Sequence, residues 1–500
     1  MTGLGKAARR LTGGATLALA LLAAGVVIPQ PDLGWGWGHP APRSSPLGYA
    51  PPPGDPAPAG RGEARQPAGG WGDPRRPVGW MGASLPDGRV PGGAGGPVLG
   101  VVGYKPAVLA WLDPMTLRPL PGPRLRLRYG ISSYGWSPDR SLLALGDVDD
   151  DVLHLVDPAR LRRLGTMDFG IVAEAPQSLA WLGPRRVAVV AGDSGDGSTL
   201  VMVDPVARRV LTRRRLPPAD LAVAAAGNRL VLLRSPVEGI GPVRLLVVDG
   251  QGRVGQVELG EIHAGFQNPP DWDRPGAYGI GHSAGLAVDP EGGRAFVVAA
   301  AAAVAEVDLA GLRVTYRHLR QPVSLLRLAH WLVPPAEAKW GAGSWRGACW
   351  LGDGTLAVSG GASSIVGDTV AEQRMDQRPS GLKLVDTRSW TVRPLDPAAT
   401  SVAWRSGRLL SYGGAWDVDA QRERGVGLTL YGPGSRPGRQ LLAARLVVDA
   451  DLNGDLAYVE VDNGHGGLGH LVVSLRDGQV LASADGPGPF LLLGDRDRSC

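Results

Sequence analysis

The chain has 500 residues, of which 44% are hydrophobic and 20% are charged, so it can bury a large core and is globular over most of its length. Its formal net charge is only +5, and no window rich in basic residues is interleaved with aromatic residues, which argues against nucleic acid as a partner. The densest basic cluster is interpreted as the solvated face of a strand and consists of Arg208, Arg209, Arg213, Arg214 and Arg215.

Residues 1–28 are predicted to be a signal peptide or an N-terminal membrane anchor. Three basic residues, Lys6, Arg9 and Arg10, precede an apolar stretch over residues 16–28, which is shorter than the roughly 20 residues of a spanning helix. The nearest small-residue cleavage site, Ala23-Ala24-Gly25, leaves three apolar residues behind, so cleavage and anchoring both stay open. We expect an extracytoplasmic protein, secreted or tethered to the membrane by this segment only.

Residues 29–97 are predicted to be a largely disordered linker. They include 16 prolines and 17 glycines and show no sustained period of a strand or a helix. Such a segment buries too little apolar surface to offset the entropy of ordering it.

The sequence contains two cysteines, Cys349 and Cys500. They can pair in an oxidising compartment, or Cys349 can be a buried thiol that behaves as a small apolar residue. The sequence leaves both alternatives open.

After Val98 a short apolar strand enters a tight turn and returns as a second strand, eight times in all. Six of these hairpins carry an aspartate at the turn, and the aspartates are 44, 47, 45, 59 and 78 residues apart: Asp113, Asp157, Asp204, Asp249, Asp308 and Asp386. An additional pair of strands precedes most of the hairpins. Self-similarity at about 40 to 50 residues indicates repeated four-stranded units.

The segment Tyr134–Gly146 contains a strand, the residues Trp-Ser-Pro-Asp and another strand, a pattern that resembles WD-repeat-like and YVTN-type β-propellers. The resemblance implies an all-β propeller domain over residues 98–500. We predict eight four-stranded blades, with the C-terminal strand Pro489–Gly494 joining the N-terminal blade and closing the ring; the 78-residue interval makes seven blades the alternative. Four tryptophans at one position of the first strand are expected to pack between adjacent blades: Trp136, Trp181, Trp350 and Trp404.

Most long connections of the predicted propeller fall on one face, which makes that face the expected binding surface. The two longest, residues 262–282 and 321–346, flank the fifth blade, and the second contains a predicted amphipathic lid helix. Polar and aromatic residues there are candidate ligand-binding residues: His263, Asn268, Asp271, Trp272, Asp273, Arg274, Tyr278, His282, Trp340 and Trp345. The alternative is a proline-anchored loop whose polar groups cap its own backbone.

Residues Asp449, Asp451, Asn453, Gly454 and Glu460 match the spacing of a calcium loop. Strand-like flanks make the FG-GAP type of propeller blade a closer resemblance, matched by Asp451, Asn453, Gly454 and Asp455, although Leu456 and Val459 depart from that motif. The two patterns together make Asp449, Asp451, Asn453 and Asp455 possible Ca²⁺ ligands. A plain Asn-Gly hairpin turn is the alternative. The acidic run Asp147–Asp151 is another possible cation site or a solvated loop.

No Gly-x-Ser-x-Gly, phosphate-loop, His-Glu-x-x-His or Cys-x-x-Cys motif is present. We therefore expect an exported, monomeric, non-catalytic β-propeller that binds a protein, glycan or small molecule through its loop-rich face. The alternative is a propeller enzyme of lyase, lactonase or quinoprotein type, with its site at the channel mouth near blade five.

Overall fold

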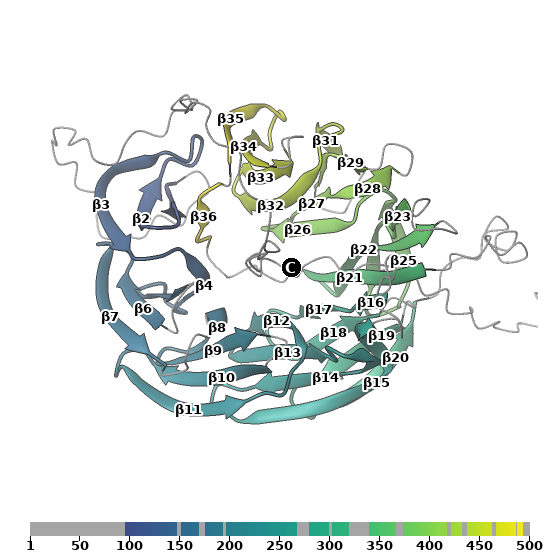
Figure 1. Cartoon of the computed structure of the whole chain (residues 1–500), viewed down its shortest axis with the longest axis horizontal. Coiled ribbons are helices and arrows are strands. Elements are labelled where there is room, and N and C mark those ends of the chain that lie inside the picture. Colours follow the sequence, from purple (N-terminus) through teal and green to yellow (C-terminus); the bar gives the residue numbers. More distant parts are fainter. Residues whose placement is uncertain are drawn as a thin grey trace, which may run out of the picture. The chain divides into compact units, whose positions relative to one another are not determined.

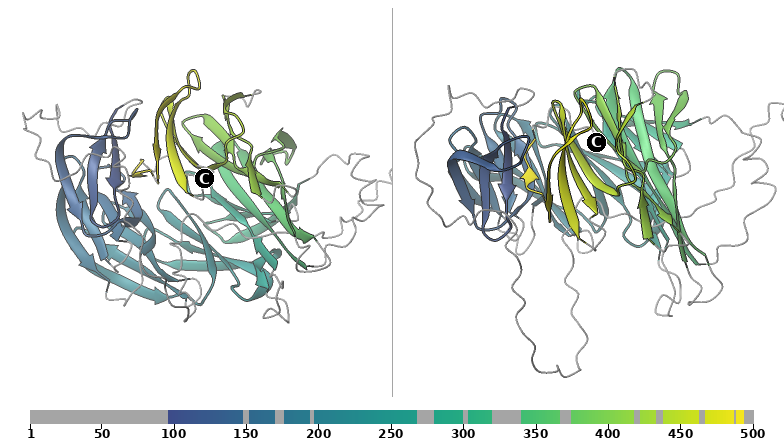
Figure 2. Two further views of the ribbon diagram at one scale, coloured as in Figure 1. Left: turned by 45° about the horizontal axis from the view of Figure 1, so that its top comes forward. Right: turned by 90° about the horizontal axis from the view of Figure 1, so that it is seen from above.

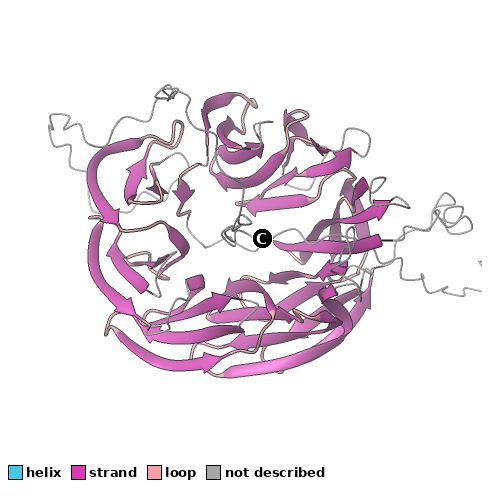
Figure 3. Cartoon of the chain, viewed as in Figure 1, coloured by secondary structure: helices cyan, strands magenta, loops and turns pink. Residues whose placement is uncertain are grey.

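The structure is a computed structural model that describes residues 96–147, 152–169, 176–193, 197–267, 280–299, 303–319, 340–366, 374–417, 422–432, 438–462, 467–486 and 488–493. These residues form strands and turns only (Figure 3). Among them, no helix has the length and hydropathy needed to span a membrane. The predicted signal segment, the predicted lid helix and all of the linker except residues 96 and 97 lie outside the described residues.

Antiparallel four-stranded units follow one another along the chain, and we number them in chain order. Six of them, units 1, 2, 3, 5, 7 and 8, are separate sheets. In each unit the first strand faces the centre of the ring in Figure 1 and the fourth lies at the periphery. The prediction of an all-β propeller is confirmed.

Unit 1 consists of β36 (Phe490–Leu491), β1 (Val98–Val102), β2 (Ala107–Leu112) and β3 (Pro119–Leu127). Unit 2 consists of β4 (Ile131–Trp136), β5 (Leu143–Asp147), β6 (Val152–Asp157) and β7 (Arg162–Asp168). Unit 3 consists of β8 (Pro176–Gly183), β9 (Arg186–Asp193), β10 (Gly197–Asp204) and β11 (Arg209–Arg215). Unit 5 consists of β17 (Gly285–Val288), β18 (Arg294–Val298), β19 (Ala303–Asp308) and β20 (Arg313–His318).

Unit 7 consists of β26 (Ser401–Arg405), β27 (Arg408–Tyr412), β30 (Leu428–Tyr431) and β31 (Arg439–Leu442). Unit 8 consists of β32 (Val447–Asn453), β33 (Leu456–Asp462), β34 (Leu468–Ser474) and β35 (Val480–Asp485). The hairpin of β28 (Gly414–Asp417) and β29 (Arg422–Gly425) is inserted between β27 and β30.

The remaining two four-strand runs belong to one ten-stranded sheet, so the prediction of eight separate blades is not what the structure shows. Unit 4 is the run β12 (Asp220–Ala226), β13 (Arg229–Ser235), β14 (Gly239–Val248) and β15 (Val254–Gln267). Unit 6 is the run β21 (Trp340–Gly352), β22 (Thr355–Val366), β24 (Leu382–Asp386) and β25 (Val392–Asp396), with β23 (Arg374–Pro379) on β22. They are fused because β16 (Ile280–Ser283) pairs with β15 on one side and β21 on the other.

The first strand of unit 1 comes from the far end of the chain. Residues Gly100 and Val101 of β1 pair with Leu491 and Phe490 of β36. Two side chains of β4 bind the residues that follow β36. Tyr134 Oη donates a hydrogen bond to Leu493 O at 2.9 Å, and Trp136 Nε1 donates one to Leu492 O at 3.2 Å. Two segments from opposite ends of the predicted propeller domain are thereby joined in one sheet.

The apolar core lies between units rather than within them. Each of eight buried clusters joins two consecutive units; one, for example, combines Leu112 and Val98 of unit 1 with Tyr458 and Val472 of unit 8. Three of the four repeated tryptophans are buried at these interfaces: Trp136, Trp181 and Trp350. Trp181 donates a hydrogen bond to Gly135 O at 2.9 Å and Trp350 stacks on Phe296 at 5.1 Å, so their predicted packing role is confirmed.

The repeated aspartates cap the turns between the third and fourth strands. In each, a carboxylate oxygen accepts one or two backbone N–H groups two to four residues later, as Asp386 Oδ1 does from Arg388 and Ser389 at 2.8 Å. The fourth residue after the aspartate has a positive φ in five turns: Leu117, Leu161, Arg208, Leu312 and Trp390. The side-chain bonds stabilise a backbone shape that those residues do not favour.

The basic cluster of β11 and its preceding turn is exposed, as expected, but part of it joins two units. Arg208 donates to Leu164 O and Arg213 to Phe169 O, both in the chain of unit 2. Arg186, Arg229 and Arg439 likewise reach backbone carbonyls of the following unit. Arginine side chains therefore connect several pairs of neighbouring units.

Cys349 is buried in β21 and is disulfide-bonded. The only other cysteine of the sequence, Cys500, lies outside the described residues. Of the two alternatives that the sequence leaves open for Cys349, the structure has the disulfide.

Candidate functional site

Several strands of units 4 and 6 continue past the length of a blade and pair with one another there (Figure 2). We call this extra layer the strand platform; it consists of Gly239–Pro242 of β14, His263–Gln267 of β15, β16, Trp340–Arg346 of β21, Gly360–Val366 of β22, and β23. Part of the region predicted as long loops is therefore strand. Two glycines with positive φ, Gly265 and Gly360, mark where blade becomes platform, and a Cβ on either would meet backbone within 2.3 Å.

The platform carries four of the ten candidate ligand-binding residues. His282 pairs in register with Gly265 of β15 and with Ser344 of β21, and His263 lies two residues before Gly265. Trp345 pairs with Ser283, and Trp340 is the first residue of β21. The other six candidates lie outside the described residues: Asn268, Asp271, Trp272, Asp273, Arg274 and Tyr278.

A histidine and a serine meet across the platform. His282 Nδ1 and Ser344 Oγ are 2.9 Å apart, a pairing that can activate a serine hydroxyl. However, the Ser344 side chain is only 4% exposed, so its oxygen has little open surface for a substrate. His263, in contrast, is exposed between the buried residues Ile262 and Ala264.

Trp345 is packed into its own sheet. It is 9% exposed, and its ring lies over Gly361 on the neighbouring strand, where a Cβ would come within 2.4 Å of the ring. Next to it, Arg346 donates to the carbonyls of Trp345 at 2.8 Å and Gly361 at 3.1 Å, and burial lowers the pKa of its guanidinium to about 10. These two side chains therefore stabilise the base of the platform.

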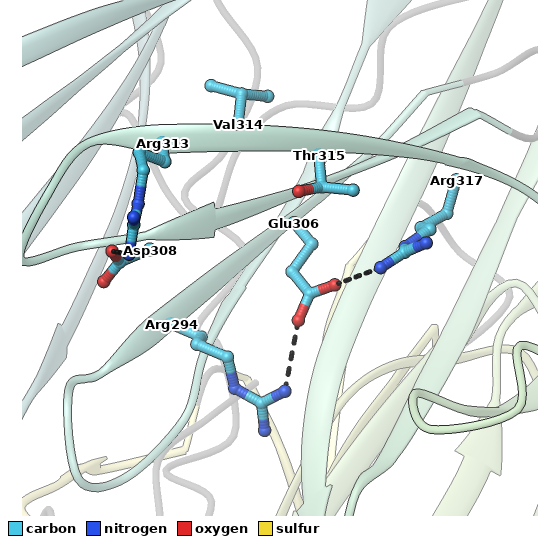
Figure 4. A pocket seen from close by; sticks show the side chains of 7 residues that line it. All are labelled: Arg294, Glu306, Asp308, Arg313, Val314, Thr315 and Arg317. Atoms are coloured by element: carbon cyan, nitrogen blue, oxygen red, sulfur yellow. Dashed lines mark hydrogen bonds and ion pairs between the residues drawn. The ribbon is translucent and has the colours of Figure 1, made fainter.

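An open pocket of about 640 Å³ lies on the outer strands of unit 5 (Figure 4). Its lining is almost entirely polar: Arg294, Glu306, Asp308, Arg313, Val314, Thr315 and Arg317. The two carboxylates face arginines across the sheet, since Glu306 binds Arg294 at 3.1 Å and Arg317 at 3.6 Å, and Asp308 binds Arg313 at 3.2 Å. A charged ladder thus crosses β18, β19 and β20.

Aromatic rings of unit 6 lie behind this ladder. The Arg317 guanidinium is 5.4 Å from the Trp390 ring centre, and that of Arg294 is 5.6 Å from the Trp350 ring centre. The arginines are therefore held in place by the rings as well as by Glu306. The pocket offers guanidinium and hydroxyl donors beside carboxylate acceptors.

The sequence predicted none of these pocket residues. One feature of the sequence points to the pocket: Arg313, Thr315 and Arg317 occupy alternate positions of one strand, so their side chains lie on one face of the sheet. The carboxylates come from the partner strand, with Glu306 opposite Thr315 and Asp308 opposite Arg313. The hairpin of β19 and β20 belongs to the sequence repeat, but the sequence alone does not give the register that brings these charges together.

The candidate calcium turn joins β32 and β33. Gly454 and Asp455 form a two-residue turn between the paired residues Asn453 and Leu456, and Gly454 has φ +57. The Asp455 carboxylate binds Arg476 at 2.6 Å and also binds Arg408, which lowers its pKa. Asp449 instead accepts a hydrogen bond at 3.5 Å from Tyr412, whose pKa is raised by burial and by this carboxylate.

These residues do not fit a calcium loop, because two arginines occupy the carboxylate of the turn. Within the described residues, no three side chains of His, Cys, Asp or Glu gather as a metal site would require. We derive no metal chemistry from this turn.

Comparisons with known proteins add a likeness of fold. No family model matches the chain, and no curated protein matches it. The dihydro-heme d1 dehydrogenase NirN, solved in complex with DHE, has a TM-score of 0.47 and 13% identity over 78% of this chain and 74% of its own. Sqt1 of Saccharomyces cerevisiae has a TM-score of 0.42 and 12% identity over 72% of this chain and 87% of its own.

BamB of Moraxella catarrhalis has a TM-score of 0.39 and 10% identity over 72% of this chain and 92% of its own. At these identities the likeness concerns the fold alone, and it carries no statement about a ligand or a reaction. All three TM-scores are below 0.5, so the β-propeller assignment rests on the sheets of this chain.

Proposed function

We propose that this protein is an exported, non-catalytic β-propeller that binds a glycan in the pocket on the outer strands of unit 5. The observation that carries the proposal is the alternation of guanidinium donors and carboxylate acceptors along one sheet face. Export rests on the sequence of residues 1–28, and the two long connections beside unit 5 remain a further predicted binding surface.

Sugar hydroxyl groups both donate and accept hydrogen bonds, so neighbouring hydroxyls suit a surface that offers both kinds of partner. An arginine has five N–H donors, and Glu306 engages only part of those of Arg317. The Thr315 side chain lies between the two arginines of β20 in Figure 4 and adds a hydroxyl. The volume of about 640 Å³ falls within the range of about 300 to 1,000 Å³ that is common for small-ligand sites.

We also propose that units 4 and 6 act as blades and that the ring has eight blades, closed by β36. The eight buried clusters support this, because every unit packs on the one before it and the one after it. The platform strand β16 then joins two blades that stand on either side of unit 5, without adding a blade.

A glycan array probed with the labelled protein, followed by calorimetric titration of the best oligosaccharide, tests the binding proposal. We expect Arg317→Gln to weaken binding about tenfold or more, since a hydrogen bond to a charged group contributes about 1.5 to 3 kcal/mol. Arg393→Gln, an exposed arginine on β25 outside the pocket, is the matched control and should bind as the parent does. An array without hits, or equal losses in both variants, would refute the proposal.

A further inference from the structure

Three arginines converge where units 3 and 4 face each other. The buried cluster of this interface contains Leu200 of β10, Leu232 of β13 and Leu246 of β14. Arg214 pairs in register with Leu200, so both side chains point to the same face of unit 3, towards unit 4.

On unit 4, Arg234 follows Leu232 by two residues and Arg244 precedes Leu246 by two. Alternation along a strand places both arginines on the face turned towards unit 3. They are also direct partners in the register of β13 and β14. The three guanidinium groups therefore approach the outer margin of one apolar interface from three strands.

Among the described side chains at this margin, the three arginines outnumber the carboxylates that bind them. Glu258, opposite Arg244, accepts from its Nε and Nη2 at 3.1 Å, and both side chains are about half exposed. The Arg214 side chain makes no hydrogen bond or ion pair with any described residue. Like charges placed directly opposite each other on a sheet, as Arg234 and Arg244 are, destabilise the pair.

Arg234 is the most constrained of the three. Its Nη2 donates to Pro217 O at 2.9 Å, whereas its Nε is buried and has no hydrogen-bond partner in the described part of the chain. Burial, together with the charges of Arg244 and Arg214, lowers the pKa of its guanidinium. A buried donor without an acceptor is unfavourable, and an added anion would supply one.

The pocket of unit 5 shows how this chain arranges arginines that need no added ion. There, Glu306 lies between Arg294 and Arg317, and Asp308 neutralises Arg313. At the interface of units 3 and 4, in contrast, the three arginines have one carboxylate partner among the described side chains, Glu258.

We propose that Arg214, Arg234 and Arg244 form a binding site for a tetrahedral oxyanion, a phosphate or sulfate group. Donors that arrive from three strands are best matched by acceptor atoms that point in three different directions. A carboxylate has two oxygens in one plane, whereas phosphate and sulfate present four in a tetrahedron. The same recognition chemistry applies to an anion that is free in solution and to one carried by a larger molecule.

Thermal unfolding in inorganic phosphate, compared with chloride at equal ionic strength, tests the site. We expect phosphate to raise the melting temperature of the parent protein, because a ligand that binds only the folded state stabilises it. Arg214→Gln and Arg234→Gln should each lose most of this shift, with binding weaker by about tenfold or more. Arg124→Gln, an exposed arginine of β3 in unit 1, is the matched control and should keep the full shift.

The same titration with glycerol phosphate separates the two sources of the anion. A larger shift with the ester than with inorganic phosphate indicates a group carried by a larger molecule, and an equal or smaller shift indicates the free anion. The Arg214 side chain has no hydrogen bond or ion pair to lose among the described residues, so its replacement should leave the fold intact by circular dichroism. A phosphate shift that is absent from the parent, or that survives unchanged in Arg214→Gln and Arg234→Gln, would overturn the proposal, whatever the outcome of the glycan experiment.

Discussion

The aspartates that reveal the repeat in the sequence are structural at the scale of single residues. Hydrogen bonds from backbone N–H groups lower the pKa of Asp308 and Asp386, and arginine partners add to the same effect at Asp157, Asp204 and Asp249 against the opposing effect of burial. A carboxylate is suited to capping these turns because it accepts several hydrogen bonds at once and keeps its charge at neutral pH. The repeated aspartates therefore report the fold and not a reaction.

The pKa of Asp386 leads to a prediction about acid stability. Its pKa in the folded state is below the ordinary value of 3.8, so the unfolded chain binds the proton more readily and the carboxylate stabilises the fold above that pH. We expect Asp386→Asn to be less stable than the parent at pH 7. The difference should shrink as the pH falls through 3.8 and lower.

Urea unfolding at a series of pH values measures this difference. Asp485→Asn, on the outer strand β35, is a suitable control. A gap between Asp386→Asn and the parent that is as large at pH 2.5 as at pH 7 would contradict the assignment.

At the scale of strands, β16 decides how the sheets are connected. It is four residues long, yet it pairs antiparallel with β15 and parallel with β21. The strand platform therefore depends on one short element for its continuity, while each blade has its own ladder of hydrogen bonds.

We expect Gly281→Pro to open the platform and leave the blades folded, because proline cannot donate to either neighbouring strand. Hydrogen exchange followed by mass spectrometry should show faster exchange in the peptides that contain Gly265–Gln267 and Gly343–Trp345. Exchange in the hairpin of β19 and β20 should stay unchanged. Equal protection of the platform in variant and parent would show that β16 does not hold it together.

The blades were predictable from the sequence because their signals are local. An aspartate turn, an alternating strand and a tryptophan at a fixed position recur within about 40 to 50 residues, which gave the propeller and its tryptophan wedges. The platform was not predictable, since β16 and the first half of β21 carry mainly glycine and small polar residues. Neither the charged pocket of unit 5 nor the arginine cluster between units 3 and 4 was predictable from the sequence. Arg214 and Arg234, for example, come together only when units 3 and 4 pack against each other.

At the scale of the whole domain, the two-residue strand β36 matters more than its length suggests. Leu492 and Leu493, which follow it, are 2% and 4% exposed, and burying a leucine side chain contributes about 1.5 to 3 kcal/mol. Without this segment, β1 becomes an open edge and Tyr134 and Trp136 lose their acceptors.

We therefore expect removal of residues 489–500 to lower the melting temperature by more than about 5 °C and to promote association through β1. Removal of residues 494–500 alone keeps β36 and its hydrogen bonds, and the comparison of the two truncations isolates the contribution of residues 489–493. Calorimetry and light scattering measure the two effects. If both truncated proteins melt together and stay monodisperse, unit 1 does not need β36.

The pairing of β36 with β1 also determines when unit 1 can be completed during synthesis of the chain. Strand β1 leaves the ribosome early, but the partner for its inner edge is not synthesised until Phe490 and Leu491 are added. A nascent or prematurely terminated chain therefore displays an unpaired strand that chaperones and proteases recognise. Addition of Phe490 and Leu491 is thus the step that removes the open edge of β1.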